Sequence, residues 1–138
     1  MDCRHIIALI DAVDGTAAAI ATVAGSASTS AANDLVHARR TLSTQAIELS
    51  RAIEDGVVSQ LGDHPSRAAV ELRRDYLDRS NRARSVVADH QGKWPAVAMR
   101  DAIGQYRIDV KRLHADQQAY RAWLKNEFVP RSARLLEQ

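Results

Sequence analysis

The sequence predicts an all-α protein, a bundle of four helices that run up, down, up and down, with a shorter first helix and three long ones. Three observations support this fold class. Alanine and arginine, both good helix formers, are abundant, while the 138 residues include only six glycines and three prolines. Apolar residues recur every three or four positions along four segments, as on one face of an α-helix. Glycine, proline and serine separate those segments, which indicates turns.

The first helix is predicted over residues 3–24. Its apolar residues follow one helical face: Ile6, Ile10, Val13, Ala17, Ile20 and Ala24. Gly25 is a suitable helix stop, and the Ser/Ala-rich stretch 26–33 predicts a flexible loop. These bounds make the first helix the shortest of the four.

The second helix is predicted over residues 31–61, with Gly56 as a weak point near its end. Its apolar face consists of Leu35, Ala38, Leu42, Ala46, Leu49, Ile53, Val57 and Leu61. Gly62 ends the helix, and residues 63–66 offer caps for the next one around Pro65. Because this turn is short, helices two and three are expected to be antiparallel neighbours.

The third helix is predicted over residues 66–90. It has the weakest apolar face, because Arg79 and Ser80 occupy positions where apolar residues are expected. The other members of that face are Ala69, Leu72, Tyr76, Ala83, Val86 and Val87. The sequence QGKWP at 91–95 predicts the next turn, with Trp94 filling the end of the bundle.

The fourth helix is predicted over residues 93–129 and is the longest, on the order of 50 Å at 1.5 Å per residue. Its apolar face is formed by Met99, Ile103, Tyr106, Val110, Leu113, Tyr120 and Leu124, with Gln117 as an interruption. Charged residues between them, such as Arg112 and Arg121, are expected on the opposite, solvent-facing side. The helix is predicted to end at Val129, before Pro130, so that residues 130–138 form a short C-terminal tail, with one more helical turn through Leu135 and Leu136 as an alternative.

The length fits one domain that spans residues 1–138. The net charge is +2, but residues 1–63 carry four basic and eight acidic residues, whereas residues 64–138 carry fifteen and nine. Opposite net charges favour antiparallel packing of the two halves. The N-terminal segment lacks the basic start and unbroken apolar run of a signal peptide, and no apolar run reaches the length of a membrane span. A soluble, cytoplasmic protein is therefore expected.

The sequence lacks the motifs of metal and cofactor chemistry. None of the five histidines follows a glutamate by three residues, and no His-x-x-x-His pair occurs. Cys3 is the only cysteine, and no glycine-rich phosphate loop or Gly-x-Ser-x-Gly sequence is present. We therefore expect no metal, no cofactor and no enzymatic activity.

A helical bundle without such motifs is best interpreted as a non-enzymatic protein that acts through protein–protein contact, as an adaptor, an assembly factor or a chaperone-like protein. Trp123 and Phe128, near the end of the fourth helix, are the candidate residues for contact with a protein partner, because exposed aromatic residues mark interfaces. Alternatively, they cover the Ile6–Ile10 end of the same bundle. A homodimer is one assembly that such a contact would form.

The second helix suggests a different function. The sequence LVHARRTL, residues 35–42, places Arg40 three residues after His37, one helical turn away. This stretch resembles a histidine-containing phosphotransfer domain, which is also a four-helix bundle and carries a lysine at that spacing. The resemblance implies that His37 accepts a phosphoryl group and that Arg40 stabilises its charge. Thr41 stands where that family has a glycine.

Nucleic-acid binding is the remaining alternative. The third helix carries four candidate arginines for phosphate contact: Arg73, Arg74, Arg82 and Arg84. The acidic residues Glu71, Asp75 and Asp78 lie among them, whereas a duplex-binding helix has a cleaner basic face. Arg79 and Asp75 are spaced for an ion pair within the helix.

Overall fold

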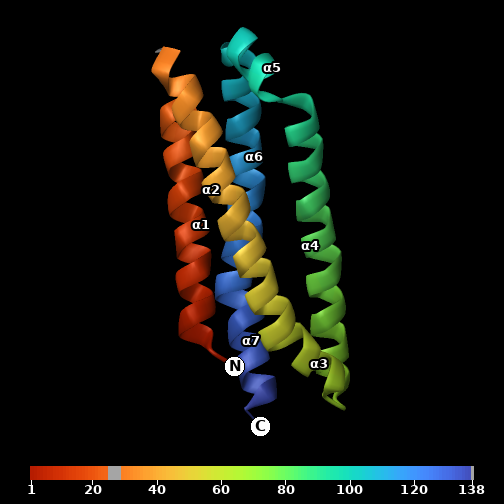
Figure 1. Ribbon diagram of the computed structural model, residues 1–138. Coiled ribbons are helices and arrows are strands. Elements are labelled where there is room, and N and C mark those ends of the chain that lie inside the picture. Colours follow the sequence, from red (N-terminus) through yellow and green to blue (C-terminus); the bar gives the residue numbers. More distant parts are fainter. Residues whose placement is uncertain (25–28, 138) are drawn as a thin grey trace.

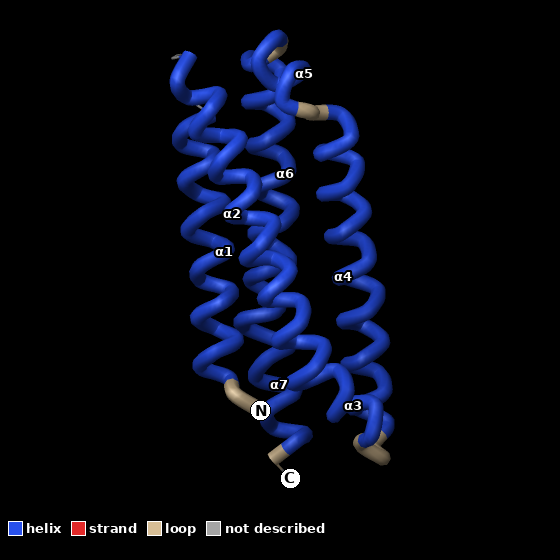
Figure 2. Tube along the Cα trace, viewed as in Figure 1, coloured by secondary structure: helices blue, strands red, loops and turns tan. Residues whose placement is uncertain are grey.

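The computed structural model describes residues 1–24 and 29–137, and over these residues the protein is a long, narrow assembly of helices (Figures 1 and 2). The described part contains no β-strand, so the prediction of an all-α protein is confirmed. In chain order the elements are α1 (Cys3–Ala24), α2 (Thr29–Ile53), the π-helical turn η1 (Glu54–Val58), α3 (Ser59–Asp63), α4 (Arg67–Lys93), α5 (Ala96–Asp101), α6 (Ile103–Trp123), the π-helical turn η2 (Leu124–Phe128) and α7 (Val129–Leu136).

The long helices lie lengthwise beside one another (Figure 1). From the N-terminus α1 runs to the far end, α2 returns, α4 runs out again, and α6 with α7 brings the C-terminus back beside the N-terminus (Figure 1). The helix α1 packs on α2 and on α6, and α6 packs on α4. The helix α2 connects to α4 through η1 and α3 at one end of the molecule.

The apolar core consists of two clusters. The cluster near the termini joins residues such as Ile10, Ile53 and Phe128 from α1, α2 and η2. The cluster near α5 joins residues such as Ile20 and Tyr106 with the buried Trp94 and Met99. Between the two clusters, the middle of the molecule contains buried polar side chains, which is where the candidate site lies.

The start of α2 differs from the expected loop. The helix begins at Thr29, so the second part of the Ser/Ala-rich stretch 26–33 is helical, while its first residues lie outside the described residues. At the other end the helical path continues through η1 and α3 to Asp63. Ser66 caps α4, because its Oγ accepts a hydrogen bond from the Ala69 N–H at 3.1 Å.

The prediction of one continuous fourth helix over residues 93–129 is wrong, because the helical path is interrupted within this range. Ala102 has φ −132° and ψ 50°, which breaks the helical path and separates α5 from α6. Beyond Val129 the tail is helical, in agreement with the alternative of a further turn through Leu135 and Leu136. The helix continues past Pro130 because of η2, in which the Val129 N–H donates to the Leu124 carbonyl five residues back. This wider turn makes room for the proline ring, which would clash with a regular α-helical turn.

Candidate functional site

A cavity that is partly open to solvent lies between the two apolar clusters and is lined by α1, α2, α4 and α6. It consists of two adjoining pockets of about 130 and 220 Å³. Both pockets are lined by Val13, Ala46, Val87, Gln91, Gln117 and Arg121. The first pocket extends toward α5 along the apolar side chains Ala17, Ile20, Leu42, Val110 and Leu113. The second extends toward η1 along Leu49, Ile53, Tyr76 and Leu124.

Arg121 is a buried cation at the junction of these two pockets. The residue is only 5% exposed, and its Nε donates to Oδ1 of Asp14 on α1. Among the described residues, its Nη2 has no hydrogen-bond partner. A buried N–H group without a partner is costly, and the cost is larger for a charged group. The guanidinium therefore presents a donor for which the surrounding side chains provide no acceptor.

The expectation that Arg121 faces solvent is wrong, and helical geometry gives the reason. Arg121 lies four residues after Gln117 and three before Leu124, so it shares the inward face of the helix with them. Asp14, one turn beyond Ile10 on α1, supplies the counter-charge that lowers the free-energy cost of burying the Arg121 guanidinium. Sequence reasoning missed the site because it ranked positions by hydrophobicity alone.

The end of the cavity near α5 carries further polar groups. The Nη1 of Arg39 donates to the Trp94 carbonyl, a neutral acceptor, at 2.8 Å. Burial and the neighbouring Arg39 lower the pKa of His90, which favours its neutral form. His114 also lines this pocket, and among the described residues its Nδ1 has no hydrogen-bond partner.

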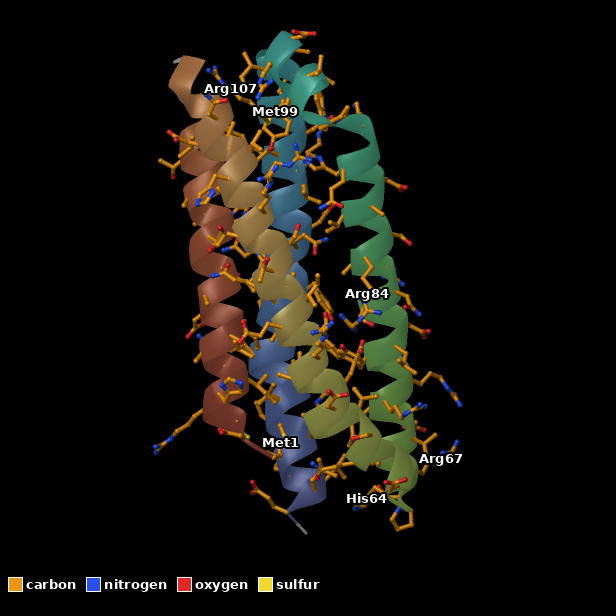
Figure 3. The ribbon with its side chains drawn as sticks, in the orientation of Figure 1. Met1, His64, Arg67, Arg84, Met99 and Arg107 are labelled. Atoms are coloured by element: carbon orange, nitrogen blue, oxygen red, sulfur yellow. The ribbon has the colours of Figure 1, made fainter. Side chains whose placement is uncertain are left out.

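The end of the cavity near η1 is closed by an ion pair and by tyrosines. Arg84, which Figure 3 labels on α4, donates to Glu54 of η1. This contact joins the two sides of the opening. Burial raises the pKa of Tyr76 to about 12 and raises that of Tyr120 as well. Tyr76 stacks on Phe128 with ring centroids 4.9 Å apart. With Arg39, Arg84 and Arg121 facing Asp14 and Glu54, the charge balance around the cavity is positive.

The outer face of α1 is a second feature of interest. This helix is long and apolar enough to cross a bilayer, yet in its most apolar stretch only 28% of the residues are buried in the molecule. Such a helix is compatible with a soluble protein, in which its buried side faces α2 and α6. The first half of the helix exposes Arg4, His5 and Asp11. The other exposed residues are small: Ala8, Ala12, Gly15, Ala18, Ala19 and Thr22.

The candidate partner-contact residues lie against their own molecule. Phe128 is 0% exposed and belongs to the cluster that contains Ile6 and Ile10, so it has no surface to offer to a partner in this fold. Trp123 is partly buried, and the Arg79 guanidinium lies 4.5 Å from the centre of its ring. This arrangement agrees with the alternative in which the two aromatic residues cover one end of the bundle.

His37 and Arg40 are both exposed on α2, so the structure leaves the imidazole accessible. The Thr41 hydroxyl donates to the His37 backbone carbonyl at 3.3 Å. This hydrogen bond does not involve the imidazole ring. A phosphoacceptor histidine must be accessible to the phosphodonor, and the exposed position of His37 meets this requirement.

The four arginines proposed for nucleic-acid contact are exposed on α4, but they do not form one stripe. At about 100° per residue, Arg82 lies on the side of the helix opposite Arg73, and Arg74 lies between them. Arg84 is engaged with Glu54. The structure therefore does not gather these residues into a phosphate-binding face.

In residues 1–24 and 29–137, no group of three or more histidine, cysteine or acidic side chains is placed to hold a metal ion. Comparison of the chain with protein-family models, with curated proteins and with solved structures gave no match.

Proposed function

We propose that this chain is an up-down-up-down four-helix bundle that acts without enzymatic chemistry, through protein–protein contact, with the cytoplasm as its location. The first partner that we propose is a second copy of the chain, bound through the outer face of α1. The observation that carries this proposal is the contrast between the apolar composition of α1 and the small part of it that is buried. Apolar surface left uncovered favours association.

The chemistry of the α1 face fits a second copy. From Ala8 to Ala24 its charged residues are Asp11, which is paired with Lys125, and Asp14, which is engaged with Arg121, so each carboxylate of the face has its own counter-charge. A two-fold axis brings the same patch of two molecules together, and small side chains allow the helix backbones to approach closely. An interface of one helix per copy lies near the lower limit of about 1,000 Å² for specific contacts, which predicts a micromolar rather than a tighter dimer.

The test is the molar mass measured by light scattering as the concentration rises into the high micromolar range. The wild-type mass is expected to approach that of a dimer. Gly15→Lys is expected to remain monomeric, since a Cβ at Gly15 meets nothing within 4 Å and the new charge enters only the interface. Gly104→Lys on α6 is the matched control, because its Cβ is equally unobstructed, and it should dimerise like the wild type. A wild-type protein that stays monomeric contradicts the proposal.

A second candidate function is phosphotransfer through His37, which the exposure of the imidazole favours. In this proposal a phosphorylated receiver domain donates its phosphoryl group to His37, and Arg40 stabilises the transferred charge. The expected result is an acid-labile phosphate on the wild-type chain that His37→Ala abolishes and Arg40→Ala reduces. Absence of label, or label that survives in His37→Ala, excludes this function.

A further inference from the structure

We propose that the central cavity binds a small molecule with one carboxylate head and an unbranched apolar chain, such as a fatty acid. Nothing in the protein-contact function requires this site. The residues of α1 that line the cavity, Val13, Ala17 and Ile20, are buried, while the proposed dimer face is on the exposed side of the same helix.

The size of the cavity selects a chain-like molecule rather than a helix of a partner protein. Two pockets of about 130 and 220 Å³ are far too small for an α-helix, whose diameter with side chains is about 10 Å. The opening between α2 and α4 is also limited at both ends. The Arg39–Trp94 hydrogen bond closes it near α5 and the Arg84–Glu54 ion pair closes it near η1. Along α2 these two points are roughly 20 Å apart at 1.5 Å per residue.

Arg121 identifies the head group. Its Nε is engaged with Asp14, and among the described residues its Nη2 has no partner, although the residue is 5% exposed and lines both pockets. A carboxylate oxygen accepts a charge-assisted hydrogen bond from such a group. The ion pair with Asp14 neutralises Arg121, but the three arginines around the cavity, Arg39, Arg84 and Arg121, outnumber Asp14 and Glu54 by one. A single negative charge therefore balances the site, whereas a phosphate dianion would leave excess negative charge there.

The lining toward α5 identifies the tail. Ala17, Ile20, Leu42, Val110 and Leu113 form an apolar wall that leads away from Arg121, and the polar side chains of Arg39, His90 and His114 lie at the α5 end of the same pocket. Transfer of each methylene from water to such a wall is expected to raise the affinity roughly four-fold, until the pocket is full.

The direct test is calorimetric titration of the full chain with octanoate, decanoate, decanol and decylammonium, each below its micellar concentration. We expect one decanoate per chain, weaker binding of octanoate, and at least about tenfold weaker binding of decanol and decylammonium. Equal affinity for decanoate and decanol overturns the assignment of the head group. Absence of binding by every probe overturns the site.

Variants locate the ligand. Val87→Phe introduces a larger side chain into both pockets and is expected to abolish decanoate binding, while Val70→Phe, at an exposed position of the same helix, is expected to leave it unchanged. Arg121→Met is expected to lower the affinity for decanoate to that for decanol. If Arg121→Met does not fold, Val87→Phe still tests whether decanoate binds in the cavity. Unchanged decanoate binding by Val87→Phe contradicts this binding site. Gly15→Lys should bind decanoate like the wild type, which separates this site from the dimer.

Discussion

At the scale of single residues, the ion pair between Arg121 and Asp14 joins α6 to α1 at the edge of the apolar cluster near the termini, next to Val13 and Leu124. The side chain of Arg121 is 7% exposed and that of Asp14 is 39% exposed, so the pair is buried from one side only. Removal of one partner from a buried pair is strongly destabilising, because the remaining charge stays in a poorly solvated place. Partial exposure of Asp14 reduces this penalty without removing it.

Asp14→Ala is therefore expected to lower the free energy of unfolding by roughly 2–3 kcal/mol, somewhat below the range for fully buried pairs. The measurement is urea unfolding followed by circular dichroism. The double variant Asp14→Leu with Arg121→Met is expected to recover most of the loss, because both charges leave together. Asp11→Ala is the control, since its partner Lys125 is solvent-exposed, and its urea midpoint should stay close to that of the wild type. A similar loss in both single variants would contradict a special role for the buried pair.

At the scale of helices, the packing of α1 is the element that periodicity predicts best. The six residues predicted on its inner face are the six buried residues of the helix, so this prediction is confirmed. The prediction succeeds because α1 has neighbours on two sides, α2 and α6, along its length. Alternating steps of three and four residues are sufficient when a helix is in contact throughout.

The apolar faces of the other helices depart from prediction in the middle of the molecule. Leu42 and Ala46 of α2, Val87 of α4, and Leu113 of α6 all belong to predicted apolar faces, yet none of them is fully buried. All four line the cavity. Periodicity tells which side of a helix faces inward, but not whether the next helix approaches closely enough to cover it. The cavity could therefore not be predicted from the sequence.

The π-helical turn η1 gives a prediction at this scale. Gly56 lies inside it, its φ is not positive, and a Cβ there meets nothing within 4 Å. Gly56→Ala is expected to stabilise the protein by about 0.5–1 kcal/mol, because alanine loses less backbone entropy on folding. Urea unfolding measures this gain. Gly62→Ala is the comparison, and a similar gain is expected because its Cβ would lie in ordinary van der Waals contact with the Arg73 side chain, 3.4 Å from the Nε. A loss of stability in Gly56→Ala would mean that the π-turn requires glycine.

At the scale of the whole molecule, the charge asymmetry of the sequence corresponds to contacts between the halves. Three ion pairs each join an acidic residue of the first 63 positions to a basic residue of the rest: Asp14–Arg121, Asp11–Lys125 and Glu54–Arg84. The antiparallel path of the chain brings these partners together (Figure 1). Opposite net charges of the halves thus support the packing, as the composition predicts, although it could not specify which residues pair.

The tyrosines give a prediction for the cooperativity of the whole fold. Burial raises the pKa of all three, to about 12 for Tyr76 and in the same direction for Tyr106 and Tyr120. A phenol whose pKa is higher in the folded than in the unfolded state contributes stability below the ordinary value near 10 and loses it as the pH rises above that value. The native protein should therefore show little tyrosinate absorbance near pH 10, whereas the urea-unfolded chain should be about half ionised there. Above that pH, tyrosinate should appear together with the loss of helical circular dichroism. A tyrosine that titrates near pH 10 while the helical signal is intact would show that at least one ring is accessible to water in the folded chain.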